Sequence, residues 1–141
     1  MMEYTYIAKG GPYGVFITIL GDISPLADRS EYEQITSNVA IKWMPGLAVK
    51  GEKLCEKDKQ SIVQAIKRIE FDKSHLLDEC IMICIYSIQY NYCDFQQEGL
   101  TVGMMYWCQR HLNANIGMIE SRYDNVLQKY IFYHNGEIIH S

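Results

Sequence analysis

The residues best suited to chemistry lie in the run Asn91-Tyr92-Cys93-Asp94-Phe95-Gln96-Gln97-Glu98, between a strand-like stretch and a helix-like stretch. A thiol at a helix N-terminus is favoured in its nucleophilic thiolate form, because the positive end of the helix dipole stabilises the anion. Cys93 could therefore be a nucleophile, but the reaction would also need a general base. Histidines that could supply it occur only in other segments, at His75, His111, His134 and His140.

The same run is also typical of a strand that ends and a helix that begins, and this is the interpretation we favour. The carboxylate of Asp94 can accept hydrogen bonds from backbone N–H groups of the following turn, and Gln97 stands where a capping-box partner belongs. We therefore predict that Asp94 is the N-cap of a helix and contributes about 1 kcal/mol to stability.

Neither a metal nor a phosphate group is expected to bind this chain. Cys80 and Cys84 would lie about 13 Å apart on one strand face, too far to hold one ion. The run Gly10-Gly11-Pro12-Tyr13-Gly14 leads into a strand-like stretch, so it predicts a hairpin turn and not a phosphate-binding loop. No pair among the five cysteines has C-x-x-C spacing, and we expect all of them to be reduced: Cys55, Cys80, Cys84, Cys93 and Cys108. We expect no cofactor.

Two stretches have the periodicity of amphipathic helices. From Glu56 to Ile69, the residues Ile62, Ile66 and Ile69 form one apolar stripe. The second helix should begin after Asp94 and end near Asn113. Its apolar stripe consists of Leu100, Met104, Trp107 and Cys108, with His111 at the end.

The strongest strand prediction is Glu79 to Asn91, whose two faces are both apolar as far as Tyr86. It should be a central strand covered on both sides. Asn135-Gly136 between two β-prone runs predicts a type I′ hairpin turn. The other expected strands are Tyr4–Lys9, Val15–Leu20, Val39–Met44, Leu47–Lys50, Ile116–Glu120, Leu127–His134 and Glu137–His140, with a loop from Gly21 to Ser30.

These elements predict one α+β domain that spans residues 1–141. Strands outnumber helices, so we expect a mixed, mainly antiparallel sheet with two principal helices and hairpins at both ends.

Composition limits the classes of function. The chain has 141 residues, of which 48% are hydrophobic, and a formal net charge of −4. A basic excess that would favour nucleic acid is missing. No apolar run is long enough to span a bilayer, and Met1-Met2-Glu3-Tyr4 lacks the features of a signal peptide. We therefore expect a cytoplasmic protein that binds neither nucleic acid nor membrane.

Residues 79–112, with the junction from Cys93 to Leu100, resemble the strand-to-helix unit in domain IV of translation elongation factor G. The small acidic chain without a catalytic motif is also similar in style to the immunity proteins of bacterial toxin systems. The second resemblance implies a cytoplasmic protein that binds a toxin.

We therefore expect a non-catalytic protein-binding module, such as an immunity protein that neutralises a bacterial toxin with a basic domain. Tyrosine is enriched in protein interfaces, and 11 tyrosines are many for this length. A small cysteine-dependent enzyme that uses Cys93, and a homo-oligomeric regulatory or assembly module, stay open as alternatives. The expected binding residues are Tyr90, Tyr92, Asp94, Glu98, Tyr123 and Asp124.

Overall fold

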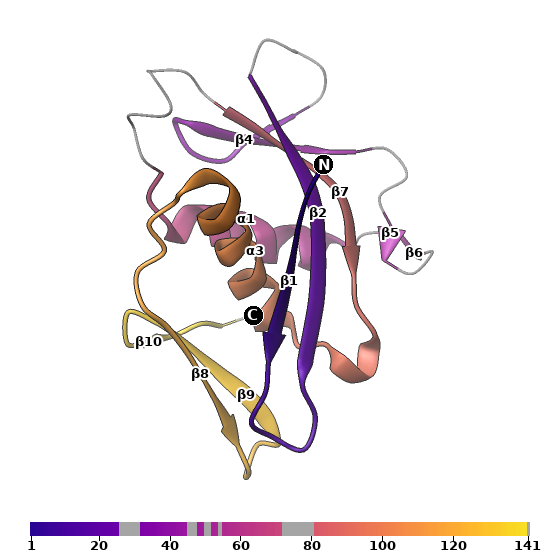
Figure 1. The fold of residues 1–141 in the computed structure, drawn as a ribbon, viewed down its shortest axis with the longest axis vertical. Coiled ribbons are helices and arrows are strands. Elements are labelled where there is room, and N and C mark those ends of the chain that lie inside the picture. The colour runs from indigo at the N-terminus through magenta and orange to yellow at the C-terminus, as the bar shows by residue number, and fades with distance from the viewer. Residues whose placement is uncertain (26–31, 45–47, 50–51, 54, 72–80, 141) are drawn as a thin grey trace.

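A computed structural model describes residues 1–25, 32–44, 48–49, 52–53, 55–71 and 81–140, with the backbone alone at positions 25, 48, 49, 52, 53 and 92. Its elements form two main sheets and two helices, which lie against one face of the larger sheet, with the smaller sheet at one end of the molecule (Figure 1). The predicted α+β class, with a mixed sheet, two principal helices and terminal hairpins, is confirmed.

The larger sheet has five strands in the order β1-β2-β7-β4-β3. The predicted N-terminal hairpin is present as β1 and β2, and β7 lies in the centre, as its apolar faces predicted. Strand β4 runs parallel to β7, whereas the other neighbours are antiparallel. The strands are β1 (Met2–Ala8), β2 (Val15–Pro25), β3 (Glu33–Gln34), β4 (Val39–Trp43) and β7 (Ile81–Gln89).

The smaller sheet holds the C-terminal strands in the order β10-β9-β8. Asn135 and Gly136 join β9 to β10 with φ values of 51° and 83°, so the predicted turn with two positive φ angles is confirmed. The strands are β8 (Ile119–Asp124), β9 (Lys129–His134) and β10 (Glu137–Ile138). A separate ribbon pairs β5 (Ala48–Val49) with β6 (Glu52–Lys53).

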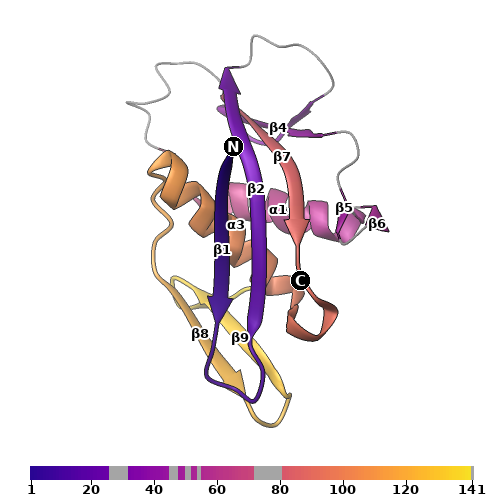
Figure 2. The same ribbon diagram turned by 45° about the vertical axis from the view of Figure 1, so that its right-hand side comes forward.

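Helices α1 (Glu56–Arg68) and α3 (Gln97–Leu112) pack against each other, and α3 crosses β1 and β2 (Figures 1 and 2). The predicted stripe of α1 is buried. Gly99 lies where α3 approaches the sheet, and a Cβ atom there would come within 2.8 Å of Val15 Cγ1. The absence of a side chain at Gly99 therefore sets the distance between helix and sheet.

A β-bulge changes which residues of β7 face the helices. Strict alternation would put Ile88 on the face opposite to Ile83 and Ile85. The register with β2 shifts between Leu20 and Gly21, and all three isoleucines are buried in the core beneath the helices. The extra residue of a bulge inverts the alternation beyond it, which the sequence pattern did not reveal.

Two strand boundaries were predicted wrongly. Strand β2 continues through Gly21 to Pro25, where a loop was expected, because its pairing with β7 supplies the hydrogen bonds. The segment after Ile116 joins the sheet only from Ile119. The remainder of the predicted loop, residues 26–31, lies outside the described residues.

Asp94 is not a helix N-cap, which corrects the prediction. It ends a short 3₁₀ helix, η1 (Tyr92–Asp94), and α3 begins three residues later with Gln96 at the N-cap position. The extended backbone of Phe95 and Gln96 separates the two helices, so the Asp94 carboxylate is too far along the chain to cap α3. Asn113 does end α3 as expected, with φ of 53°.

Candidate interaction surface

Tyr90, one of the expected binding residues, is buried and belongs to a polar network between the helices. Its hydroxyl donates to Asp58 Oδ2 at 3.1 Å, and its ring stacks on Phe95 with centroids 3.7 Å apart. Asp58, only 2% exposed, also accepts from Gln97 Nε2 at 2.9 Å. Gln97 Nε2 lies 2.8 Å from Ser61 Oγ as well. These contacts stabilise the junction of α1, α3 and β7, so Tyr90 has a structural role.

Glu98 is also mostly buried, and it connects α3 with the C-terminal sheet. Its Oε1 lies 3.8 Å from Lys129 Nζ, and its Oε2 accepts from Gln96 Nε2 at 3.0 Å. These two contacts engage both oxygens of the Glu98 carboxylate within the chain.

Tyr123 and Asp124 lie at the far end of β8. Asp124 Oδ1 accepts from the N–H groups of Val126 and Leu127, both at 2.9 Å, and so closes the turn into β9. The ring of Tyr123 packs edge-on against Tyr130, with centroids 5.2 Å apart. Asp94 is partly exposed in η1, and for Tyr92 the backbone alone is described.

Many of the tyrosines pack in one chain of aromatic rings that crosses the molecule. It starts with Tyr4 and Tyr6, which both stack on Tyr106 of α3. Burial raises the pKa of the Tyr6 hydroxyl, and the nearby Tyr106 adds to the shift. The chain continues through Phe132 and Tyr130 to Tyr123 and Tyr13. The abundance of tyrosine therefore reflects internal packing to a large extent.

Cys93, the candidate nucleophile, is exposed in η1. Among the described residues, no histidine forms a hydrogen bond with it. His134 Nε2 lies 2.9 Å from the carbonyl oxygen of Ile116, and His111 Nε2 lies 3.0 Å from that of Glu3. His75 and Cys80 lie outside the described residues. Within the described part of the chain, no three His, Cys, Asp or Glu side chains are grouped so that they could hold a metal ion.

The outer face of the C-terminal sheet is a different kind of surface. We use this name for the face that carries Met118, Glu120, Arg122, Tyr133 and Ile138, opposite to the buried Tyr130, Phe132 and His134. The register pairs Glu120 and Ile138 with Tyr133, one on each side of β9.

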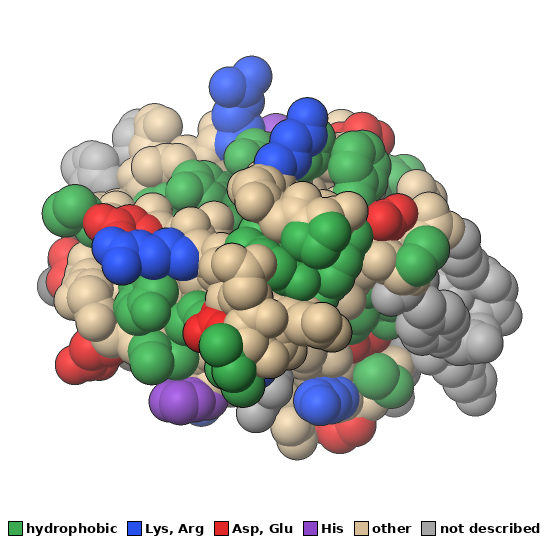
Figure 3. All heavy atoms as spheres, turned by 90° about the horizontal axis from the view of Figure 1, so that it is seen from below, with side chains coloured by type: hydrophobic (Ala, Val, Ile, Leu, Met, Phe, Trp, Pro, Cys, Tyr) green, Lys and Arg blue, Asp and Glu red, His purple; other side chains and the backbone are tan. Residues whose placement is uncertain are grey.

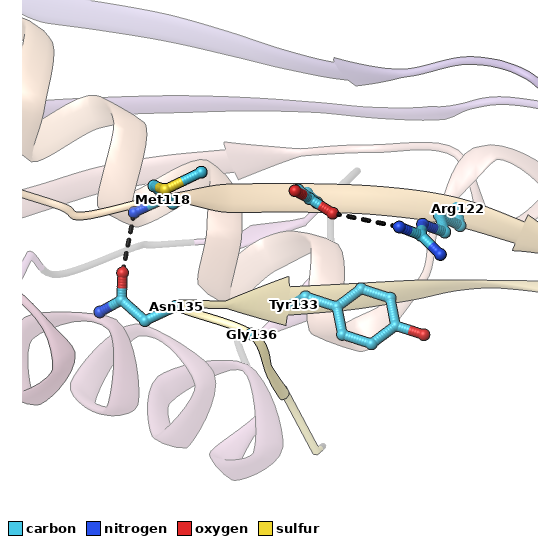
Figure 4. Close-up of a pocket in the computed structure, with 6 residues that line it drawn as sticks. Met118, Arg122, Tyr133, Asn135 and Gly136 are labelled. Atoms are coloured by element: carbon cyan, nitrogen blue, oxygen red, sulfur yellow. Dashed lines mark hydrogen bonds and ion pairs between the residues drawn. The ribbon is translucent and has the colours of Figure 1, made fainter.

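A hollow of about 520 Å³ lies on this face, lined by Met118, Glu120, Arg122, Tyr133, Asn135 and Gly136 (Figure 4). Arg122 lies 3.5 Å from Glu120 and 5.7 Å from the centre of the Tyr133 ring. Asn135 Oδ1 accepts from the N–H of Met118 at 2.9 Å and so holds the other end of the hollow. An arginine, a tyrosine and a methionine thus surround one depression.

Apolar side chains are unusually exposed on this face and at the hairpin tip beside it. Met118 is 70% exposed and Ile138 is 46% exposed, although both flank or belong to strands. At the tip of the β8–β9 hairpin, Val126 is 91% exposed and Leu127 is 59% exposed. Figure 3 views the molecule from this end and shows hydrophobic side chains reaching the surface between scattered charges.

Met118, Val126, Leu127 and Ile138 were not among the binding residues expected from the sequence. One signal was present: the Val126-Leu127 pair follows Asp124-Asn125 in a turn, where apolar side chains have no sheet face to cover.

The described helices include none that is both long enough and apolar enough to cross a membrane. Neither the comparison with protein-family profiles nor that with curated proteins finds a match. Among solved structures, a crystal structure of a Thermus thermophilus protein is similar, with 10% identity and a TM-score of 0.48 over 92% of this chain. The chain spans only 16% of that protein's length. The resemblance to elongation factor G domain IV stays a prediction.

Proposed function

We propose that this chain is a non-catalytic protein-binding module that binds its partner with the outer face of the C-terminal sheet. The observation that carries the proposal is that the exposed Met118 and Arg122 line a hollow with Tyr133, and that the exposed Ile138 lies opposite Tyr133 on β10. Methionine, tyrosine and arginine are enriched in protein interfaces, and exposed apolar patches mark binding surfaces.

The partner we favour is a basic protein, and the form of function we favour is neutralisation of a bacterial toxin in the cytoplasm. The net charge of −4 supports this choice, because opposite charges increase the rate of encounter. Binding should then weaken as salt screens the charges, mainly through a lower association rate.

The test compares the same substitution, isoleucine to lysine, at two positions that are equally exposed. Ile138→Lys alters the proposed face, and Ile7→Lys alters an equally exposed isoleucine on the larger sheet, 46% and 45% exposed respectively. Affinity would be measured for the protein encoded beside this chain's gene, with circular dichroism to confirm folding. The proposal predicts that Ile138→Lys and Met118→Glu weaken binding at least about tenfold and Ile7→Lys does not. Equal effects at Ile7 and Ile138 would refute the choice of face.

A second comparison separates binding from catalysis. Cys93→Ser should protect cells from the partner as well as the parent does, because binding needs no thiol chemistry. If the folded Cys93→Ser protein loses all protection, the chain acts as a cysteine-dependent enzyme and the binding proposal fails.

A further inference from the structure

Strand β8 is an edge strand of unusual openness. It pairs with β9 on one side only, and both ribbon views place it along the outer margin of the molecule (Figures 1 and 2). Three of its six residues, Glu120, Ser121 and Arg122, are exposed. Two other edge strands of the main sheets, β3 and β10, are much shorter, with two residues each.

The edge of β1 is partly covered by side chains of α3. Trp107 Nε1 donates to the carbonyl oxygen of Met2 at 3.1 Å, and His111 Nε2 lies 3.0 Å from the carbonyl oxygen of Glu3. Among the described edge strands, β8 is the longest whose carbonyl groups accept no such hydrogen bond from a helix side chain.

The pairing of β8 with β9 determines which backbone groups point outward. The N–H of Asn135 donates to the carbonyl oxygen of Met118 at 2.8 Å, so the even-numbered residues of β8 hydrogen bond with β9. The N–H and C=O groups of Ile119, Ser121 and Tyr123 point to the opposite side. Within the described part of the chain, these groups form no backbone hydrogen bonds.

The outward N–H and C=O groups limit the registers in which two copies of β8 can pair. We consider antiparallel pairing about a two-fold axis. Only the odd-numbered residues can bond across the edge, so an odd residue must lie opposite an odd residue. Placing Ser121 opposite itself meets this condition. It also places Glu120 of each copy opposite Arg122 of the other.

The neighbouring registers that also meet the condition bring like charges together. A shift in one direction puts Glu120 opposite Glu120. A shift in the other puts Arg122 opposite Arg122, and Glu120 opposite Asp124. Opposite charges across strands stabilise pairing and like charges destabilise it. Charged side chains on an edge strand usually prevent association with another strand. With Ser121 opposite Ser121, however, the charges of the two copies are opposite and attract each other.

We propose that the chain forms a two-fold symmetric dimer through β8, with Ser121 of the two copies on the axis and Glu120 of each opposite Arg122 of the other. The two three-stranded sheets become one continuous sheet, and the two hollows lie on the same face beside the axis. This proposal does not depend on the partner proposed above, since the second copy binds the edge and not the face.

The test is sedimentation equilibrium over a concentration series, with circular dichroism to confirm that each variant folds. The parent should dimerise, and its association constant should fall at high salt. Arg122→Glu and Glu120→Arg should each lower that constant at least about tenfold, because both cross-strand pairs become repulsive. Glu137→Arg, an equal charge change at an exposed position of β10, should leave it unchanged.

Charge exchange makes the test specific to the register. The double variant Glu120→Arg/Arg122→Glu should dimerise like the parent, because the charges across the axis are again opposite. An equimolar mixture of the two single variants should form a mixed dimer with an association constant near that of the parent, although each variant alone dimerises more weakly. Ser121→Pro should abolish the dimer and leave β8–β9 paired, because it removes an N–H that points outward. A parent that stays monomeric, or a dimer that survives Arg122→Glu and Ser121→Pro, would overturn the proposal.

Discussion

The side-chain amide of Gln96 pairs with the backbone of Tyr130 in the way that a neighbouring strand would. Gln96 Nε2 donates to the carbonyl oxygen of Tyr130, and Gln96 Oε1 accepts from its N–H at 2.9 Å. Strand β10 ends before it reaches this part of β9. Gln96 thus continues the hydrogen bonding of the sheet edge and attaches the start of α3 to the C-terminal sheet.

Replacing Gln96 should therefore destabilise the fold. Gln96→Ala removes two hydrogen bonds to a buried residue, so we expect the free energy of unfolding to fall by about 2 kcal/mol. Gln96→Glu should also destabilise, because it lacks the donor and adds a carboxylate beside Glu98. Urea denaturation checks both, with Gln109→Ala, an exposed position of the same helix, as the control. If Gln96→Ala lowers the free energy of unfolding no more than Gln109→Ala does, the side-chain amide of Gln96 does not stabilise the fold.

Asp94→Ala should have little effect, since Asp94 does not cap α3. We expect the free energy of unfolding to change by less than about 0.5 kcal/mol, as for most surface substitutions. The denaturation midpoint at unchanged slope gives the value. A loss near the about 1 kcal/mol typical of an N-cap would show that the carboxylate supports the junction after all.

The buried carboxylate of Asp58 should matter more than exposed acids of the same helical turn. Asp58→Ala takes an acceptor from Tyr90 and Gln97, so we expect a loss of about 2 kcal/mol. Glu56→Ala, at an exposed position, is the matched control. A double-mutant cycle with Tyr90→Phe should give a coupling of at least about 1 kcal/mol, because the hydrogen bond joins a hydroxyl to a carboxylate. Additive effects would mean that this hydrogen bond does not stabilise the fold.

Gly99→Ala should destabilise although alanine favours helices by about 1 kcal/mol over glycine. The new Cβ would lie 2.8 Å from Val15 Cγ1, so α3 must move away from the sheet. Thermal or urea unfolding measures the loss, which we expect to be about 1–3 kcal/mol. Adding Val15→Ala should offset part of that loss by making room. A more stable Gly99→Ala protein would show that the helix does not approach the sheet so closely.

Stability should fall in alkali because of Tyr6. Its folded pKa is raised by burial, then by Tyr106, so the folded state keeps the phenol proton that the unfolded state loses above about pH 10. The stabilisation is fully present below the unfolded pKa and is lost as pH rises toward the folded value. Urea midpoints of the parent and Tyr6→Phe, measured between pH 8 and the highest pH that permits refolding, should reveal a flatter profile for the variant. Parallel profiles would exclude this contribution.

Patterns within short stretches of sequence were sufficient to predict α1, the last hairpin turn and the central position of β7. The stripe from Ile62 to Ile69 predicted α1, because helical periodicity repeats within a few residues. Asn135-Gly136 predicted its hairpin turn, because both residues tolerate positive φ. The two apolar faces of residues 81–86 predicted that β7 is central.

The surroundings of two expected binding residues were not predicted. Tyr90 and Glu98 were expected at an interface, but both are buried, and they contact Asp58 and the partly exposed Lys129 of the same chain. Met118 and Ile138 were left out, although they are exposed. Residue type alone does not say which face of a strand meets the core, since that depends on which segments pack against it.

The sequence by itself determined the secondary structure of α1 and β7, the last hairpin turn and the α+β class, because the residue patterns that indicate them repeat or lie within a few positions of the chain. Only the tertiary structure decided that α3 begins at Gln97, that β4 runs parallel to β7, that a bulge turns Ile88 inward and that Gln96 completes the edge beside Tyr130. Each of these features depends on hydrogen bonds or packing between distant segments, whose partners no local pattern identifies.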